Sequence, residues 1–589
     1  MKRVGIGPAA AGIICLGAAL GVASVVLYAV SGFGLAVGLL WLDALALVGG
    51  VLLVTSERLP RPRRADVIAP IALMLAFAPL YVWRVATLPV QVNSDEVAIM
   101  TFAKRYAAMP HPDLFGLSDY FGHPVALLVV WGKLGNLLGG VDLDHMRLLH
   151  ALTGLLTIGL SYTLFRQLLS LPWALVASAV LGVNHAFLLI SRMAMRENTV
   201  VLVEVAALTL LLLGLRRNHP FATFAGGVLA GIGYYVHFPG RMVFPVWVVF
   251  LLVLALAYRR TIGLRRLAAL GAIASAGFVL VAAPYVVAYL KAPGYLTHHQ
   301  REALLLTHDG RVLQQHWVFA RSERAGIEKN IVNGLTAFNS DHVDEAFIYP
   351  NYGHGIVDPL TGALLWLGAA AVLVQAVRRR GSPWNLFPLV GFLVLWLLFA
   401  FVVGQAPDYP RMLVILPFVA YLVTEAVQLI AGTARQLAPS RVVAPAVAVA
   451  AVAAIGVWNG FIGWDFIHAG RSTGDDIGST GRFVQDHSNI PGVTFYLAAD
   501  QGPRKYYAWG TPEIWQERLR IFAARDSQVG GVIDPGQLGT FNASPPFLIF
   551  MRSVLWYGVR GEFVRRYGDV RVHEVTPDGS HLAIGVPRA

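Results

Sequence analysis

Long apolar runs separated by short polar stretches dominate the hydrophobic pattern of the chain. A helix needs about 20 apolar residues to cross the hydrocarbon core of a bilayer, and about 13 runs reach that length. The pattern therefore predicts an α-helical polytopic membrane protein with about 13 transmembrane helices. The runs lie near residues 9–30, 33–54, 66–86, 147–169, 172–190, 197–215, 221–238, 242–258, 266–290, 359–377, 384–403, 411–431 and 443–462.

One further apolar stretch, residues 122–139, contains His123, Pro124 and Lys133. If it crossed the membrane, every later basic loop would lie outside, against the tendency of Lys and Arg to stay in the cytoplasm. We therefore predict that it lies along the interface, that the N-terminus is cytoplasmic, and that the first run is an uncleaved anchor. The inner loops then hold Lys2, Arg3, Arg58, Arg61, Arg63, Arg64, Arg166, Arg216, Arg217, Arg259, Arg260, Arg265, Arg266, Arg378, Arg379, Arg380, Arg435 and Arg441.

The same topology places three long polar segments on the outer face, at about 87–146, 291–358 and 463–589. The last of them alternates strand-like and helical patterns, which predicts an extracytoplasmic α/β domain. Its predicted strands are 492–498, 546–551 and 570–575, with a helix at 554–567. We divide the chain into two extra N-terminal helices (1–65), a transmembrane core (66–462) and this domain (463–589).

Composition excludes two classes of protein. With 56% hydrophobic and only 14% charged residues, the chain cannot be a soluble globule, in which roughly a quarter of residues are charged. The net charge of +12 follows the inner loops instead of forming one basic face, so we expect no nucleic-acid partner. The single cysteine, Cys15, allows no internal disulfide and no cysteine-based metal site.

Two adjacent carboxylates, Asp95 and Glu96, stand where a long apolar run ends. One interpretation is structural: Asn93 or Ser94 caps a helix, and acidic residues in its first turn suit the helix dipole. The other interpretation is catalytic, with a carboxylate acting as a general base at the membrane surface. The sequence around the pair leaves both open.

Other polar residues recur at the predicted outer edge. Arginines there are not explained by topology, and a guanidinium suits a lipid phosphate because it offers paired donors and stays charged. Snorkelling and mutual pairing are the structural alternative. The candidate substrate-binding residues are His123, Arg192, Arg196, Glu197, Tyr234, His237, Arg241, Tyr409 and Arg411.

Several of these motifs together resemble the C-type glycosyltransferase superfamily. They are Asp95-Glu96, Gly122-His-Pro124, Arg147, Ser191-Arg192, Arg196-Glu197 and Tyr409-Pro-Arg411. The resemblance covers about 66–431 and is greatest to the protein O-mannosyltransferase and aminoarabinose transferase branch, glycosyltransferase family 39. It implies that Asp95 acts as base on the acceptor, with Glu96 beside it. Relatives often have Lys at the position of His123.

The resemblance implies an integral membrane glycosyltransferase that uses a polyprenyl-phosphate-linked sugar. The acceptor would be a protein, lipid or glycan at the extracytoplasmic face of a bacterial plasma (inner) membrane, within the cell envelope and among its lipids. The alternative is a transporter or flippase of lipid-linked sugars, which predicts paired repeats and ionisable residues at mid-membrane. No cofactor is identified: the outer loop around His298, His299, Asp341, His342, Asp344 and Glu345 has ligand types without metal-site spacing, so a divalent cation stays open.

Overall fold

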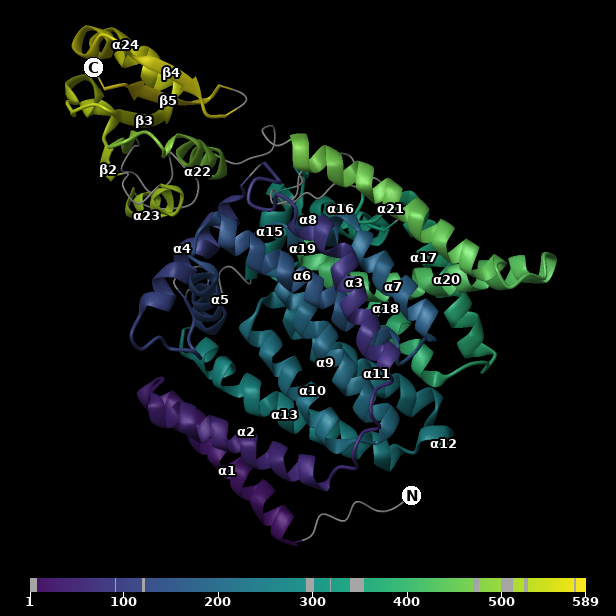
Figure 1. Ribbon diagram of the computed structural model, residues 1–589. Helices are drawn as coiled ribbons and strands as arrows, with labels where there is room; N and C mark the ends of the chain where they lie inside the picture. Colours follow the sequence, from purple (N-terminus) through teal and green to yellow (C-terminus); the bar gives the residue numbers. More distant parts are fainter. Residues whose placement is uncertain are drawn as a thin grey trace.

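The computed structural model of the protein describes residues 8–90, 92–118, 122–292, 301–317, 319–338, 354–469, 476–498, 512–523, 528–576 and 579–588. Most of these residues form helices that run side by side in one bundle (Figure 1). A small domain of strands and helices stands at one end of the bundle. The predicted combination of a polytopic helical core and a C-terminal α/β domain is confirmed.

Eleven helical segments among the described residues are long and apolar enough to cross a membrane, and a bent pair adds a twelfth. The bent pair, α7 (Leu171–Val183) and α8 (His185–Ser191), breaks by 64°. The eleven are α1 (Pro8–Ser31), α2 (Leu35–Thr55), α3 (Arg64–Val82), α6 (Leu143–Phe165), α9 (Glu197–Arg217), η2 with α11 (Phe238–Met242, Val243–Ala257), α13 (Leu264–Lys291), α17 (Pro359–Val377), η3 with α18 (Pro383–Asn385, Leu386–Phe401), α19 with η4 and α20 (Tyr409–Met412, Leu413–Ile415, Leu416–Leu437), and α21 (Val443–Ala469).

One of the predicted spans, 221–238, forms a shorter helix than the sequence suggests. It forms α10 (Pro220–Ile232) followed by a single 3-10 turn, η1 (Gly233–Tyr235). α10 nevertheless packs along both α9 and α13. Small residues allow this close approach: a Cβ at Gly227 would lie 2.1 Å from the carbonyl oxygen of Ala274 on α13.

The apolar stretch at 122–139 is not a span. It forms α5 (Val125–Leu138), whose 14 residues reach only about 21 Å. α5 packs against α4 (Ser94–Ala108) so closely that a Cβ at Gly132 would lie 2.3 Å from the Ala103 carbonyl oxygen. Its length agrees with the prediction that this stretch lies along the interface.

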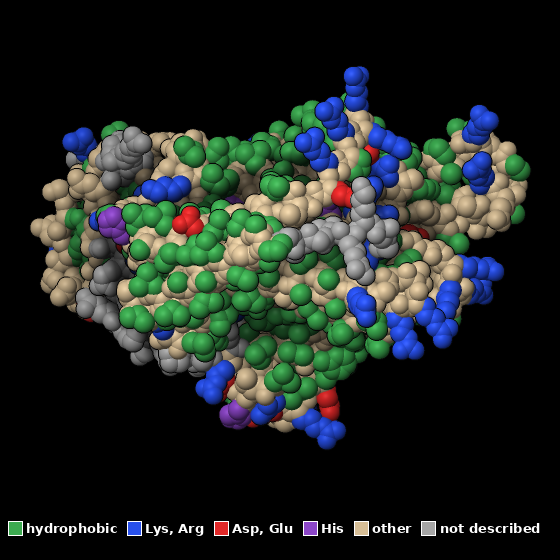
Figure 2. All heavy atoms as spheres, turned by 90° about the horizontal axis from the view of Figure 1, so that it is seen from below, with side chains coloured by type: hydrophobic (Ala, Val, Ile, Leu, Met, Phe, Trp, Pro, Cys, Tyr) green, Lys and Arg blue, Asp and Glu red, His purple; other side chains and the backbone are tan. Residues whose placement is uncertain are grey.

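The polar loops between spans carry short helices: α12 (Arg259–Ile262), α15 (His308–Trp317) and α16 (Glu323–Thr336). A space-filling view shows a broad hydrophobic surface on the bundle (Figure 2). Most Lys and Arg side chains in that view lie toward the right, the side on which α12 lies in Figure 1. One end of the bundle is thus more basic than its middle, as expected for spans flanked by cytoplasmic loops.

The C-terminal domain contains a five-stranded mixed sheet in the order β2-β1-β3-β5-β4. β1 pairs in parallel with β2 and β3, and β5 pairs in antiparallel fashion with β3 and β4. The elements are α22 (Asp476–His487), β1 (Thr494–Ala498), α23 (Pro512–Phe522), β2 (Gln528–Ile533), η5 (Pro535–Thr540), β3 (Phe547–Arg552), α24 (Ser553–Tyr567), β4 (Arg571–Glu574) and β5 (His581–Val586). The predicted strands and helix correspond to β1, β3, β4 and α24.

Candidate functional site

The two adjacent carboxylates lie in the first turn of α4, as the structural interpretation required. Asn93 is the N-cap: its Oδ1 accepts a hydrogen bond from the backbone N–H of Asp95 at 2.8 Å. In return, the backbone N–H of Asn93 donates to Glu96 Oε2 at 3.1 Å, which completes a capping box. From this shared start, the side chains of Asp95 and Glu96 enter different surroundings.

Glu96 is fully buried and faces Arg147 near the start of α6, which is also fully buried. Nε and Nη2 of Arg147 donate to the two carboxylate oxygens of Glu96, each at 2.9 Å. The backbone N–H of Ala194 donates to Oε1 at 2.8 Å. Burial by itself raises the pKa of Glu96, but Arg147 and these N–H donors outweigh it and hold the pKa below its usual range. Glu96 therefore joins α4, α6 and the turn after α8 as an ionised carboxylate.

Asp95 is 8% exposed, and its Oδ2 accepts a hydrogen bond from Nη2 of Arg196 at 3.2 Å. Nε of Arg196 lies 3.2 Å from Oε1 of Glu197, the first residue of α9. The predicted Asp95, Arg196 and Glu197 are therefore brought together from α4 and the turn that precedes α9. One arginine bridges two carboxylates, and that arrangement keeps Asp95 beside a fixed positive charge.

His237, between η1 and η2, lies beside the same group. Its Nε2 is 3.5 Å from Nε of Arg196 and 3.5 Å from Oε1 of Glu197, and its ring centroid is 5.5 Å from that of His123. Burial and then the charges of Arg196, His123, Arg411 and Arg241 lower the pKa of His237 well below its usual value. His237 is therefore neutral at neutral pH and accepts a hydrogen bond from Arg196.

Of the last two predicted outer arginines, Arg241 is held by aromatic residues of η1, η2 and α13, and Arg411 by the N-cap of its own helix. Nη2 of Arg241 donates to the hydroxyl of Tyr285 at 2.6 Å, and its guanidinium lies over the rings of Tyr234, Phe238 and Tyr285 at 5.7, 5.9 and 5.2 Å. Nη1 of Arg411 lies 3.0 Å from Oδ2 of Asp408, the N-cap of α19. Both contribute to the positive field at His237.

Two predicted binding residues are engaged elsewhere. Arg192 donates to the carbonyl oxygens of Leu80 and Trp83 at the end of α3, at 2.6 and 2.7 Å, and to that of Leu88 at 3.2 Å. Tyr409 is fully buried, and its hydroxyl donates to the carbonyl oxygen of His354 at 2.7 Å. The structure gives Arg192 the role of closing a helix terminus and Tyr409 that of joining two segments.

Within the described ranges, no group of three or more His, Cys, Asp or Glu residues is placed to hold a metal ion. Asp95 and Glu197 are bridged by an arginine, which competes with a cation for the same oxygens. The metal-ligand types noted around His298 and Asp341 lie outside the described residues. In the described site these carboxylate oxygens are thus already paired with a cationic side chain.

Residues 123–287 match the family model described as dolichyl-phosphate-mannose-protein mannosyltransferase. The predicted resemblance to the C-type glycosyltransferase superfamily is confirmed by this match over residues 123–287. The matched segment includes Arg147, Arg196, Glu197, His237 and Arg241, whereas α4 precedes it.

Three solved structures similar to this glycosyltransferase core have low sequence identity. ArnT from Cupriavidus metallidurans bound to undecaprenyl phosphate is 14% identical, with a TM-score of 0.49 over 88% of this chain and 97% of that one. Archaeoglobus fulgidus AglB, in complex with an inhibitory peptide and a dolichol-phosphate, is 14% identical, with a TM-score of 0.47 over 79% and 64%. The S. cerevisiae Pmt1-Pmt2 complex bound to the sugar donor is 18% identical, with a TM-score of 0.31 over 40% and 35%. No curated protein matches the chain.

The C-terminal domain contacts the glycosyltransferase core next to α4. α22 and α23 pack against α4, and Arg105 on α4 pairs with Glu517 on α23 at 2.5 Å. Arg482 on α22 donates to the carbonyl oxygens of Val90, Ala86 and Pro89 at 3.1, 3.4 and 3.4 Å. Burial and the nearby Arg147 lower the pKa of Arg482 to about 10, so it stays charged at neutral pH. The segment leading into α4 is therefore held by both the core and the domain.

Replacing Arg482 with Gln should loosen the segment 86–90. Loss of hydrogen bonds from a charged donor costs about 1–3 kcal/mol, so exchange of the amide hydrogens in this segment should rise by roughly fivefold or more. Hydrogen–deuterium exchange of the purified protein measures this. Arg520→Gln, at an exposed position on α23, is the matched control and should leave the exchange unchanged. Equal exchange in the two variants would mean that the core alone holds the segment.

Proposed function

We propose that the protein transfers a sugar from a polyprenyl-phosphate donor to a hydroxyl group of an acceptor. The observation that carries this proposal is the meeting of Asp95 with Arg196, His237, Arg241 and Arg411 at one end of a glycosyltransferase core. A base and several cationic groups in one place suit a reaction that removes a proton and releases a phosphate.

In the proposed reaction, Asp95 accepts the proton of the acceptor hydroxyl as its oxygen attacks the anomeric carbon of the sugar. A bond from that oxygen to the carbon forms, and the bond from the carbon to the phosphate oxygen breaks. The leaving polyprenyl phosphate takes the bonding electron pair. Arg196 donates to one carboxylate oxygen of Asp95 and so orients the group. Glu96 does not touch the reacting atoms, because Arg147 and backbone N–H groups occupy it.

Arg241 and Arg411 are our candidates for holding the phosphate. Their charges reach His237, and that histidine adds no competing charge because it is neutral. His123 and Tyr234 lie beside them and would line the sugar or phosphate site. Arg192 and Tyr409 are left out of this group because backbone carbonyls occupy their polar atoms.

The finer identity of the reaction belongs to the same proposal. The resemblance and the placement of basic loops support three further parts of it. The transferred sugar is a hexosyl or pentosyl unit, the acceptor is a protein, lipid or glycan, and the site is extracytoplasmic on a bacterial inner membrane.

A flippase for lipid-linked sugars is the second candidate. The family match favours a transferase, and the described cluster of carboxylates and arginines lies at one end of the core instead of mid-membrane.

A direct test is to incubate membranes containing the protein with radiolabelled polyprenyl-phosphate sugars, one hexose or pentose at a time. We expect label to move from the lipid fraction to a protein, glycan or lipid acceptor in one of these incubations. Membranes with the Asp95→Asn variant serve as the control. Movement of the intact labelled lipid across the bilayer, without transfer of label, would favour the flippase.

Replacing Arg241 or Arg411 with Lys should raise the KM for the donor by roughly tenfold, because Lys keeps the charge but loses the planar pair of donors. The matched control is Arg192→Lys, in which donors to backbone carbonyls are lost instead. We expect that variant to lower the unfolding temperature with little change in KM. Wild-type KM values for both Arg241→Lys and Arg411→Lys would show that the phosphate is bound elsewhere.

A further inference from the structure

A basic cavity lies at the opposite end of the core from Asp95. α6 carries Arg147 near its first turn and is followed by Arg166, so about 28 Å of helix separates the two ends. The cavity has a volume of about 750 Å³ and lies among the start of α3, the ends of α6 and α9, and the start of α7. This volume falls within the usual range of ligand sites. The glycosyltransferase mechanism uses none of its residues.

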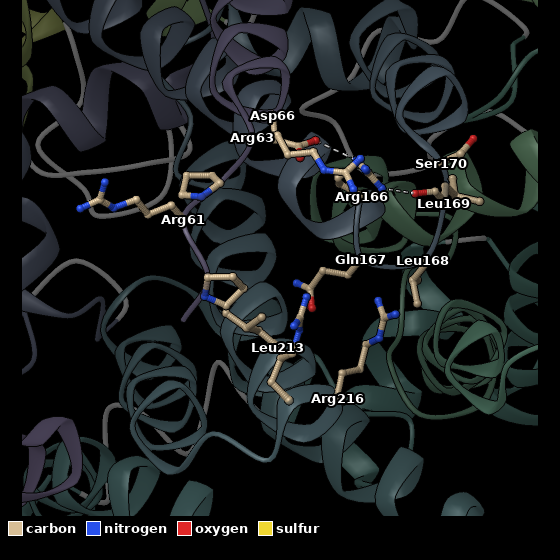
Figure 3. Close-up of a pocket in the computed structure, with 13 residues that line it drawn as sticks. Arg61, Arg63, Asp66, Arg166, Gln167, Leu168, Leu169, Ser170, Leu213 and Arg216 are labelled. Carbon is tan, nitrogen blue, oxygen red and sulfur yellow. Dashed lines mark hydrogen bonds and ion pairs between the residues drawn. The ribbon is translucent and has the colours of Figure 1, made fainter. Parts of the chain in front are cut away.

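Five arginines and one aspartate provide the charge of this cavity: Arg61, Arg63, Arg166, Arg216, Arg217 and Asp66. The negative charge of Asp66 is already paired. Nε of Arg166 donates to its Oδ1 at 2.8 Å, and the hydroxyl of Tyr162 donates to the same oxygen at 2.9 Å. Nη1 of Arg166 donates to the carbonyl oxygen of Leu169 at 3.0 Å. These contacts fix one wall of the cavity (Figure 3).

The other arginines keep their charges uncompensated. Among the described residues, Arg63, Arg216 and Arg217 make no ion pair with a carboxylate. In Figure 3 the guanidinium groups of Arg63, Arg166 and Arg216 lie around the cavity, whereas Arg61 points away from them. Basic loops that only set topology would spread into solvent, but here the ends of α3, α6 and α9 gather their arginines around one open cavity. Such a volume suits an anion.

We infer that this cavity binds a phosphate-bearing anion, the headgroup of an anionic phospholipid. Leucines and prolines complete the lining, and the cavity lies where membrane-spanning helices end, so a ligand with both a charged and an apolar part fits it. Basic pockets between spanning helices on the cytoplasmic side bind such headgroups, and anionic lipids are enriched there. Arginine donors suit the phosphate oxygens. This inference is independent of the reaction proposed for Asp95.

The test measures lipid binding to the purified full-length protein in detergent by native mass spectrometry, with phosphatidylglycerol, phosphatidylcholine and inorganic phosphate as separate probes. Wild type should bind phosphatidylglycerol more tightly than phosphatidylcholine. The double variant Arg216→Gln with Arg217→Gln should bind it roughly tenfold to thirtyfold more weakly, the effect of removing two basic residues near an anionic headgroup. Arg216→Lys with Arg217→Lys, which keeps the charges needed for topology, should fall between them.

The matched control is Arg435→Gln with Arg441→Gln, which removes two exposed arginines from another basic loop outside the cavity. It should bind phosphatidylglycerol as wild type does. Equal losses in the control and cavity variants would overturn the site in favour of a general surface effect. Wild-type affinity in both cavity variants would overturn it outright. Inorganic phosphate that displaces phosphatidylglycerol at similar concentration would assign the cavity to free phosphate and overturn the lipid headgroup.

Discussion

Asp95→Asn should reduce the rate of sugar transfer by roughly 10²–10⁴-fold, the usual contribution of a general base. The variant should still insert and bind donor. Asn keeps an oxygen that accepts from Arg196, and the cap of α4 is Asn93 instead of Asp95. Single-turnover assays with radiolabelled donor, combined with a separate binding measurement, check both parts.

Asp144→Asn is the control for this substitution. Asp144 also lies in the first turn of a helix, α6, so its replacement removes a similar interaction with a helix dipole without touching the site. Transfer by this variant should be close to that of wild type. Equal turnover in Asp95→Asn and Asp144→Asn would show that Asp95 only starts its helix.

Arg147→Met should destabilise the protein by about 3–5 kcal/mol, since it leaves Glu96 buried without its partner. The pair is completely buried and doubly hydrogen-bonded, so water cannot replace the lost guanidinium. Thermal unfolding of the detergent-solubilised protein should show the loss. A second replacement, Glu96→Gln, should recover part of it by removing the unpaired charge.

An exposed ion pair provides the comparison for Arg147→Met. Arg324 and Glu328 pair at 2.8 Å with side chains 90% and 60% exposed, and solvent screens such pairs so that they contribute little to stability. Arg324→Met should therefore shift unfolding little. If Arg147→Met shifted it no further, the Glu96–Arg147 pair would not be what joins α4 to α6.

The spanning helices were predictable because membrane insertion demands long apolar runs, which are a local property of the sequence. The exception, 221–238, fails for a local reason too: Gly233, Pro239 and Gly240 follow α10 and favour turns over helix. β2 and β5 were both missed, and at β2 two adjacent glycines, Gly530 and Gly531, weaken the strand pattern. Local signals thus account for both the agreement and the differences in the fold.

The sequence predicted which residues gather in the site better than it predicted the role of each one. Asp95 and Glu96 are adjacent and similar, and only Arg147, 51 residues later, separates their surroundings. Arg192 and Arg196 are close in the sequence, yet Arg192 donates to the end of α3 and Arg196 contacts Asp95. Arg147 stood out in the sequence at the start of an apolar run, but its pairing with Glu96 was not predicted. Arg482 gave no signal, because its partners lie more than 390 residues away in the sequence.

The carbonyl oxygen of Pro89 accepts hydrogen bonds from Arg147 of the core at 2.7 Å and from Arg482 of the C-terminal domain at 3.4 Å. A chain is synthesised from its N-terminus, so Pro89 and Arg147 enter the membrane long before residue 482 leaves the ribosome. Until then, the segment leading into α4 has the contacts from Arg147 and Arg192 but lacks those from Arg482. A chain that ends before residue 482 would lack the hydrogen bonds by which the C-terminal domain holds this segment, so the support of Asp95 would be completed only when that domain had been made.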